Sequence, residues 1–150
     1  MSHSLFVKQN ELTPVAAGLC AMFMMGKQVQ FRQYIAPSLL SCISLLFLSE
    51  KVGFLYHVNC GVFDEKLVNT ILHALDGNKI NRSNVKVVLA MLGSSESEVE
   101  RMNECINYLV KKGFQKSNLE FVYDAPSYSV NTLGQHGVFL KGHEKKASNF

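Results

Sequence analysis

Two apolar runs separated by a short polar segment constrain the fold of this chain more than any other feature. The first run covers residues 42–48 and is broken only by Ser44, and the second covers residues 52–58. The segment between them, residues 49–51, is entirely polar and has the length of a tight turn. Continuous apolar residues are typical of strands that are buried on both faces. The pattern therefore predicts a β-hairpin with both strands largely buried.

A cysteine and a histidine lie at the open end of this predicted hairpin. Cys42 begins the first strand, and His57 lies near the end of the second. A turn centred near Glu50 places the two residues opposite each other across the ladder, where directly opposed β-carbons are roughly 5 Å apart. We therefore expect the thiol and the imidazole to be close neighbours.

The segment before this hairpin indicates two further strands. Residues 16–25 form an apolar run that predicts a buried strand, and residues 28–35 alternate in polarity like a second strand. Gly26 and Lys27 lie between them and are typical of a turn. We expect these two strands to form a hairpin of their own.

The rest of the chain alternates between helices and strands, which indicates the fold class. A helix is predicted at residues 64–75, where Asp64 is a suitable N-cap, and a second helix begins at a capping box in residues 95–98 and ends near Gly113. Further strands are expected at residues 85–92, 119–123, 128–130 and 137–141, the last two forming a final hairpin. The order favours one α/β domain of the α+β type over residues 1–150. We expect a layered sandwich of mixed β-sheet with two main helices and a flexible tail at about residues 142–150.

Composition excludes several classes of protein. The chain has 150 residues, of which 47% are hydrophobic and 18% charged, as in a folded globular domain. Its net charge of +3 is too small to indicate nucleic-acid binding. The apolar run at 16–25 is shorter than the roughly 20 residues that cross a bilayer. No clear basic region precedes it, so we do not expect it to be the core of a secretion signal. We expect neither a membrane nor a nucleic-acid partner.

Cysteine and histidine spacing gives no sign of a metal site or a disulfide framework. The four cysteines form no CxxC pair, and no close set of Cys and His has zinc-finger spacing. We therefore expect no metal, no cofactor and reduced thiols inside a cell. Cys60 is interpreted as a buried loop cysteine, with a resolving thiol as the alternative. His136 is predicted to lie in a turn.

A neighbouring Cys and His pair has a well-defined chemistry. The imidazole removes the thiol proton, and the thiolate attacks an amide carbonyl to form a thioester that water releases. Backbone N–H groups stabilise the oxyanion, and the polar loop at residues 38–41 is suitable for supplying them. The alternative is an ordinary buried cysteine beside an ordinary histidine at the end of a strand. Spacing alone does not decide between the two.

The residues around this pair resemble a known family. Residues 41–45 (SCISL) followed by residues 51–58 (KVGFLYHV) are similar to the Ser-Cys segment and the histidine-bearing hairpin strand of the CheD chemoreceptor glutamine deamidases. The order of later elements is also similar, over roughly residues 28–141. The same Cys–His hairpin is found in the cytotoxic necrotizing factors, in Burkholderia lethal factor and in protein N-terminal asparagine amidases.

The resemblance implies a role for each site residue. Cys42 is the expected nucleophile and His57 the general base. A threonine six residues before the family cysteine orients the base, and this position is Ala36 here, so Ser38 or a backbone carbonyl near Tyr34 is the expected substitute. The alternative for Ser38 is a turn residue after a proline. The resemblance also places Ser41 at the oxyanion hole and allows Asn59 to line the site.

Two departures from CheD bear on the substrate. The family has a Gly-Gly-Ala after the strand predicted at 85–92, where this chain has residues 91–95 (MLGSS), and the hairpin is two residues shorter, nearer to the toxins. The resemblance implies a protein deamidase that acts on a Gln or Asn side chain of a protein substrate. We expect it to be a monomer that acts in the cytoplasm, or in a host cell if it is secreted as a bacterial effector. A transglutaminase using the same thioester is a variant of this hypothesis. A catalytically inactive protein-binding module with the CheD fold is the alternative.

Overall fold

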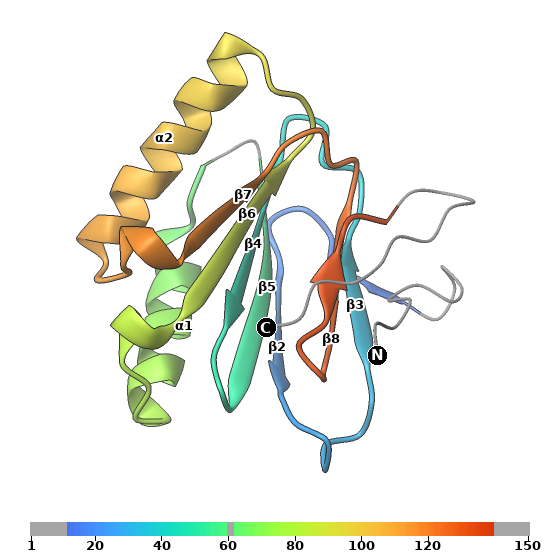
Figure 1. Ribbon diagram of the computed structural model, residues 1–150, viewed down its shortest axis with the longest axis vertical. Helices are drawn as coiled ribbons and strands as arrows, with labels where there is room; N and C mark the ends of the chain where they lie inside the picture. Colours follow the sequence, from blue (N-terminus) through green and yellow to red (C-terminus); the bar gives the residue numbers. More distant parts are fainter. Residues whose placement is uncertain (1–11, 60–61, 140–150) are drawn as a thin grey trace.

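Two packed β-sheets and a layer of helices make up the fold (Figure 1). A computed structural model describes residues 12–59 and 62–139, so the tail predicted at 142–150 and Cys60 lie outside the described residues. The larger sheet has the order β2 (Cys20–Met24), β5 (Val52–Val58), β4 (Ile43–Leu48), β6 (Lys86–Met91) and β7 (Leu119–Val122). The smaller sheet has the order β1 (Thr13–Pro14), β3 (Gln33–Ala36), β8 (Tyr128–Asn131) and β9 (His136–Gly137).

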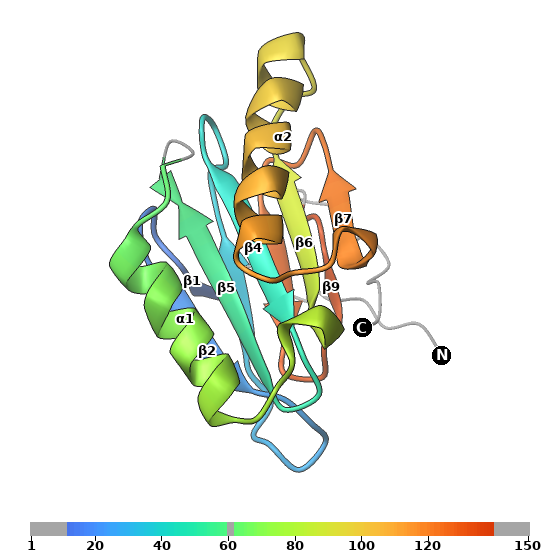
Figure 2. The same cartoon turned by 90° about the vertical axis from the view of Figure 1, so that its left-hand side faces the viewer.

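The helices cover one face of the larger sheet, and the smaller sheet covers the other. Figure 2 faces the helix layer, which contains α1 (Glu65–Gly77) and α2 (Glu96–Lys111). Short 3-10 turns at Arg82–Asn84 and Lys116–Asn118 precede β6 and β7. Each sheet contains both parallel and antiparallel pairs. The predicted layered α/β sandwich with mixed sheets is confirmed.

Both predicted helices begin at the expected caps. The Asp64 side chain accepts hydrogen bonds from the N–H groups of Lys66 and Leu67, and the Ser95 side chain accepts one from the N–H of Glu98. These bonds satisfy N–H groups that have no partner within the helix. The capping residues that the sequence pointed to therefore begin α1 and α2.

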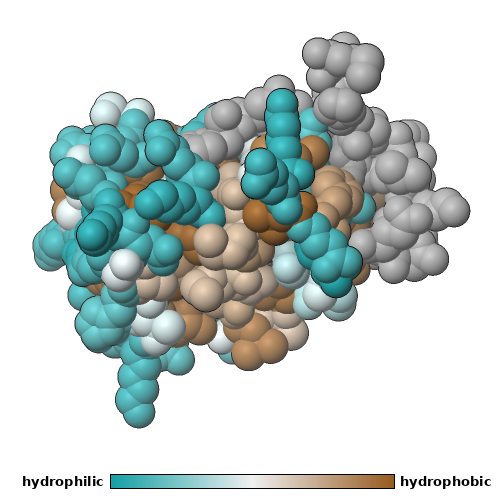
Figure 3. All heavy atoms as spheres, turned by 90° about the horizontal axis from the view of Figure 1, so that it is seen from below, coloured by the Kyte–Doolittle hydropathy of each residue, from teal (hydrophilic) through white to brown (hydrophobic). Residues whose placement is uncertain are grey.

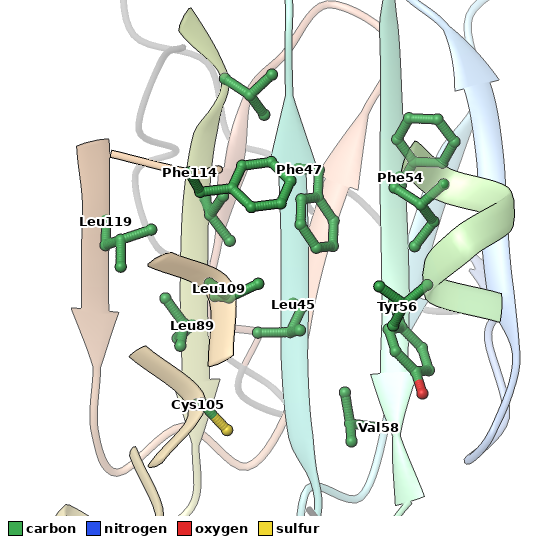
Figure 4. Packing of buried hydrophobic residues seen from close by; sticks show 14 of the residues in the cluster. Leu45, Phe47, Phe54, Tyr56, Val58, Leu89, Cys105, Leu109, Phe114 and Leu119 are labelled. Carbon is green, nitrogen blue, oxygen red and sulfur yellow. The ribbon is translucent and has the colours of Figure 1, made fainter. Parts of the chain in front are cut away.

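The central hairpin of β4 and β5 is buried on both faces, as predicted. Side chains at alternate positions pack under the helices, and Figure 4 shows Leu45, Phe47, Phe54 and Tyr56 on the side that faces Leu109 of α2. The intervening residues face the smaller sheet, where Leu46, Leu48 and Leu55 belong to a second core. Successive side chains of a strand point to opposite faces, so one apolar hairpin supplies both cores.

The register of this hairpin corrects the prediction that Cys42 faces His57. Ser44 is the residue paired with His57, and Leu48 is paired with Gly53. The turn is tighter than predicted, because the N–H of Ser49 donates to the Val52 carbonyl and the Ser49 hydroxyl bonds both the N–H and the carbonyl of Val52. The turn is therefore centred between residues 50 and 51, and Cys42 lies two residue pairs further along the ladder than predicted.

The prediction of a hairpin at Gly26 and Lys27 is wrong. β2 pairs with β5, whereas β3 pairs with β1 and β8, so the chain between them crosses from one sheet to the other. The ring of Phe23 still stacks on that of Tyr34, with centroids 5.1 Å apart, across the interface of the sheets. Packing between the layers, rather than backbone pairing, brings β2 and β3 together.

β2 is an edge strand and is less buried than predicted. Phe23 is buried, but Met22 and Met24 are 60% and 50% exposed.

Figure 3, which views the molecule from below, shows hydrophilic residues over the helix side and apolar residues toward the middle. Within the described residues, no helix is long and apolar enough to cross a membrane.

The final hairpin is confirmed as β8 and β9, which pair in antiparallel fashion. The prediction that His136 lies in a turn is wrong, because this residue is in β9, paired with Val130, and is fully buried. The second strand is predicted at residues 137–141, but β9 is His136–Gly137 and residues 138 and 139 are not in a strand, so it ends earlier than predicted. Residues 140 and 141 lie outside the described part of the chain.

We predict that Gly53→Ala destabilises the protein by about 1–3 kcal/mol, because the added methyl overpacks the core between the sheets. A β-carbon at Gly53 would lie 2.5 Å from Cε2 and 2.6 Å from Cζ of Phe23. Urea unfolding measures the change. Gly77→Ala is the control, since a β-carbon there meets nothing within 4 Å. Equal stability of both variants would contradict the packing described here.

Candidate functional site

Cys42 and His57 lie on the same face of the larger sheet, between the two sheets. Cys42 immediately precedes β4 and is 7% exposed, and His57 lies near the end of β5 and is 3% exposed. Cys42 packs in the core with Ala36, Leu39 and Leu46. The structure therefore brings the predicted nucleophile and base to one buried end of the sheet.

The His57 ring is oriented by a backbone carbonyl. Its Nδ1 lies 2.8 Å from the carbonyl oxygen of Val15, so Nδ1 carries the proton and donates it to this oxygen. Val15 is itself held by its N–H, which donates to the Ile35 carbonyl of β3 at 2.7 Å. A neutral ring in this tautomer presents the lone pair of Nε2, the form that a general base requires.

Nε2 of His57 is buried and has no hydrogen-bond partner within the described residues. The thiol of Cys42 is therefore not hydrogen-bonded to it in this structure. Hydrogen bonds between catalytic groups often form only when substrate binds. The site therefore consists of the His57 ring, held through Nδ1, its buried Nε2, which has no partner among the described residues, and the Cys42 thiol on the same face of the sheet.

The strand register defines how far apart the two residues are. The N–H of His57 donates to the Leu19 carbonyl and its carbonyl accepts from the N–H of Gly18, so its backbone bonds are directed toward β2. Ser44 and His57 thus form a non-hydrogen-bonded pair, the closer of the two antiparallel arrangements. Cys42 directly precedes β4, and extension of this register places it diagonal to His57; diagonal neighbours in a regular ladder are roughly 7–8 Å apart.

The loop before Cys42 contains two residues in the left-handed region. Ser38 has φ 55° and Ser41 has φ 64°, a conformation that is uncommon for residues other than glycine and is often found at functional sites. The N–H of Cys42 donates to the Leu39 carbonyl at 3.1 Å. From α2, Nη2 of Arg101 donates to the Ser41 carbonyl at 3.0 Å. The turn that positions the thiol is therefore held by a hydrogen bond within it and by a second one from α2.

These contacts determine what each predicted accessory residue can do. Ser38 is exposed, and the orienting contact predicted for it is made by the Val15 carbonyl. Ser41 adjoins Cys42 as expected, but the Cys42 N–H that would line an oxyanion hole is bonded within the turn. Asn59 is exposed and borders a cavity of about 270 Å³ with Tyr56 and Phe63, which pack on the helix side.

A second cavity adjoins the loop that carries Cys42. It has a volume of about 430 Å³ and is bounded mainly by apolar residues from three loops and β3, among them Leu39, Leu40, Leu92 and Pro126. Leu40 is 73% exposed at its rim. The surface beside the loop that precedes Cys42 is therefore largely apolar.

Sequence reasoning did not identify three residues that contact or adjoin this pair. Val15 acts through a backbone atom, which leaves no signal in a sequence, and Arg101 reaches the loop only through the tertiary structure. Ser44 did leave a signal, because it is the one polar residue that interrupts the run at 42–48. Within the described residues, no group of three or more His, Cys, Asp and Glu is arranged to hold a metal ion.

A second buried histidine differs from His57 in its contacts. Nδ1 of His136 lies 2.6 Å from the Tyr128 hydroxyl, in the smaller sheet. Burial lowers the pKa of His136 to about 4, and the charge of Lys86 acts in the same direction. This histidine is therefore neutral in the folded protein at neutral pH and has a structural role.

We predict that the protein loses stability as the pH falls from about 6.5 to about 4. In this range an unfolded histidine binds a proton, whereas folded His136, with its pKa lowered to about 4, does not. The unfolded state therefore gains protons, and the loss reaches about 3 kcal/mol at the acid end. Urea unfolding across this pH range measures the free energy of unfolding, which is expected to depend less steeply on pH in His136→Gln than in the wild-type protein. His73→Gln, at an exposed position of α1, retains the wild-type slope; an unchanged slope in His136→Gln would refute the assignment.

Comparisons with known proteins give no family for this chain. No family model matches it, and no curated protein matches it. A solved structure of the hypothetical protein YfiH from Bacillus licheniformis is similar at a TM-score of 0.39 and 9% identity, over 61% of this chain and 46% of that chain. The chain thus spans less than half of the length of that protein. A likeness at this level carries no conclusion about function.

Proposed function

We propose that this protein is a cysteine-dependent protein deamidase that hydrolyses a Gln or Asn side-chain amide through a thioester. One observation carries the proposal: the Val15 carbonyl holds Nδ1 of His57, which leaves on the same face as Cys42 a buried Nε2 that has no partner among the described residues. The resemblance to the CheD family and to the related toxins supports it at the level of the hairpin motif. An effector acting inside a host cell is part of the same proposal.

The reaction follows from the two side chains. Nε2 of His57 takes the proton of the Cys42 thiol, and the thiolate attacks the amide carbon to give a tetrahedral oxyanion. The imidazolium returns the proton to the leaving nitrogen, the C–N bond breaks, and ammonia departs. Water then attacks the thioester, His57 takes a proton from it, and the C–S bond breaks. The products are a carboxylic acid and the regenerated thiol.

The Val15 carbonyl takes the place of the family threonine. Ala36 occupies the threonine position and is fully buried in the same core as Cys42, so its methyl group supplies no hydrogen bond. A backbone acceptor performs the same task, since it selects the tautomer and fixes the ring. Because the acceptor belongs to the main chain, the orienting contact survives the loss of the threonine.

Formation of the oxyanion requires the turn before Cys42 to rearrange. In the resting structure the Cys42 N–H donates to the Leu39 carbonyl. Breaking this bond when substrate binds would release the N–H toward the oxyanion, and the left-handed Ser41 stores strain that favours such a change. The apolar cavity beside this turn is suited to a side chain of the substrate protein.

A catalytically inactive binding module is the second candidate. The observation that favours it is the same hydrogen bond, together with the burial of the Cys42 thiol. In this reading the apolar cavity binds a partner protein and no thioester forms. Thiol reactivity separates the two candidates.

We predict that iodoacetamide at pH 8 alkylates Cys42 faster than Cys20 or Cys105. Burial raises the pKa of Cys20 to about 12 and that of Cys105 to about 11, so both remain protonated and unreactive. Peptide mass spectrometry measures each cysteine separately. His57→Ala lowers the rate at Cys42 by at least about tenfold, because the base is lost.

His73→Gln is the control for this experiment, since it removes an exposed histidine of α1. A Cys42 that reacts no faster than Cys105, or at a rate that ignores His57→Ala, would favour the inactive module. If Cys42 is reactive, incubation with candidate proteins and mass spectrometry for amide-to-acid conversion identifies the substrate. Cys42→Ser is expected to abolish the conversion.

A further inference from the structure

We infer that Ser44 is a positioning residue of the same centre, whose hydroxyl holds the water that hydrolyses the thioester. This inference rests on the proposed function and assigns the second half of the reaction to a specific side chain. The step in question is the release of the thioester, which water performs in a hydrolase and an amine performs in a transglutaminase.

The first observation is the position of Ser44 on the strand. It is paired directly with His57, in the closer type of antiparallel pair, where opposed β-carbons are roughly 4.5–5.5 Å apart. It lies two residues from Cys42, so both side chains leave the same face of the sheet. Ser44 is therefore nearer to the base than Cys42 is.

The second observation is that two polar atoms on this directly opposed pair lack partners. Oγ of Ser44 and Nε2 of His57 are both buried, and neither has a hydrogen-bond partner within the described residues. A buried polar group without a partner costs about 1–3 kcal/mol, and such groups are rare in folded proteins. An alanine at residue 44 would avoid this cost, so the hydroxyl calls for a functional explanation.

The third observation is the small size of the neighbouring side chains. On β6 the residue paired with Ser44 is Ala90, and from β3 Ala36 belongs to the same core. The next pairs down the ladder place Leu46 and Leu55 on this face. The neighbour of Ser44 on β6 is thus an alanine, whereas the next pair on this face, Leu46 and Leu55, is bulky.

A water molecule between the two atoms would satisfy both. It accepts the Ser44 hydroxyl proton as a hydrogen bond and donates one of its own protons to Nε2 of His57. When the water attacks the thioester carbon, His57 takes that proton, the C–S bond breaks, and the proton passes to the departing thiolate of Cys42. Ser44 forms no covalent bond and undergoes no net change.

The test uses p-nitrophenyl acetate as the acyl donor. In the wild-type protein, acetylation of Cys42 releases a burst of nitrophenolate, and hydrolysis of the acetyl thioester then limits the steady rate. Ser44→Ala is expected to retain the burst and to lower the steady rate by about ten- to a hundredfold. Intact-mass spectrometry shows the acetylated protein accumulating, and Ser44→Thr, which keeps a hydroxyl, restores part of the rate.

Ser129→Ala is the matched control. Ser129 is also a fully buried strand serine whose Oγ has no partner within the described residues, but it lies in β8 of the smaller sheet. Its loss leaves both the burst and the steady rate unchanged. A slowed steady rate in this variant as well would mean that removal of any buried serine has this effect, and would overturn the inference.

The remaining outcomes separate the inference from the proposed function. If the wild-type burst is absent, or persists in Cys42→Ala, the proposed function fails. If the burst depends on Cys42 but Ser44→Ala hydrolyses the thioester at the wild-type rate, the role of Ser44 fails and the proposed function stands. Loss of the burst itself in Ser44→Ala would place Ser44 in the first step and would also overturn the inference.

Discussion

The central hairpin of β4 and β5 is buried on both faces, and the rest of the structure is arranged to cover it. One set of its side chains requires the helices α1 and α2, and the other set requires the smaller sheet. Burial of apolar surface is the main favourable term in folding, so a hairpin with two apolar faces determines a three-layer arrangement. The candidate site lies at one end of this hairpin and depends on both layers.

The hydrogen bond between His57 and Val15 links the two sheets. His57 belongs to the larger sheet, while Val15 is bonded through its N–H to β3 of the smaller one. The orientation of the imidazole therefore depends on how the sheets pack. A change in that packing would alter the tautomer and direction of the ring even if β5 itself were unchanged.

The open end of the hairpin departs from the regular structure around it. Near this end of the sheet lie two left-handed serines before Cys42 and, at Ser44 and His57, two buried polar atoms that have no hydrogen-bond partner in the part of the chain that the structure describes. Such features reduce stability, and they persist where a site requires them. The opposite end, where Ser49 closes a fully bonded turn with Val52, shows the contrasting case.

The amino-acid sequence alone predicts the hairpin, the caps at Asp64 and Ser95 and the presence of Cys42 and His57 at one end of the hairpin. These features depend on local periodicity, on turn polarity and on short-range hydrogen bonds, which neighbouring residues decide. It did not determine the register, because a shift of half a residue in the turn changes which residue faces His57. It also did not determine the partners of β2 and β3, since apolar strands pair equally well in several orders.

The group that orients the base is evident only once the chain has folded. Every residue has a backbone carbonyl, so no residue pattern could indicate that Val15 orients His57. Ala36 stands where the CheD proteins have the orienting threonine, and Ser38 was therefore expected to take over this contact. Ser44 was visible as the polar interruption of an apolar run, but its pairing with His57 required the register. The sequence therefore indicates which groups are present, a thiol, an imidazole and a hydroxyl. The packing of the two sheets determines which atoms those groups contact.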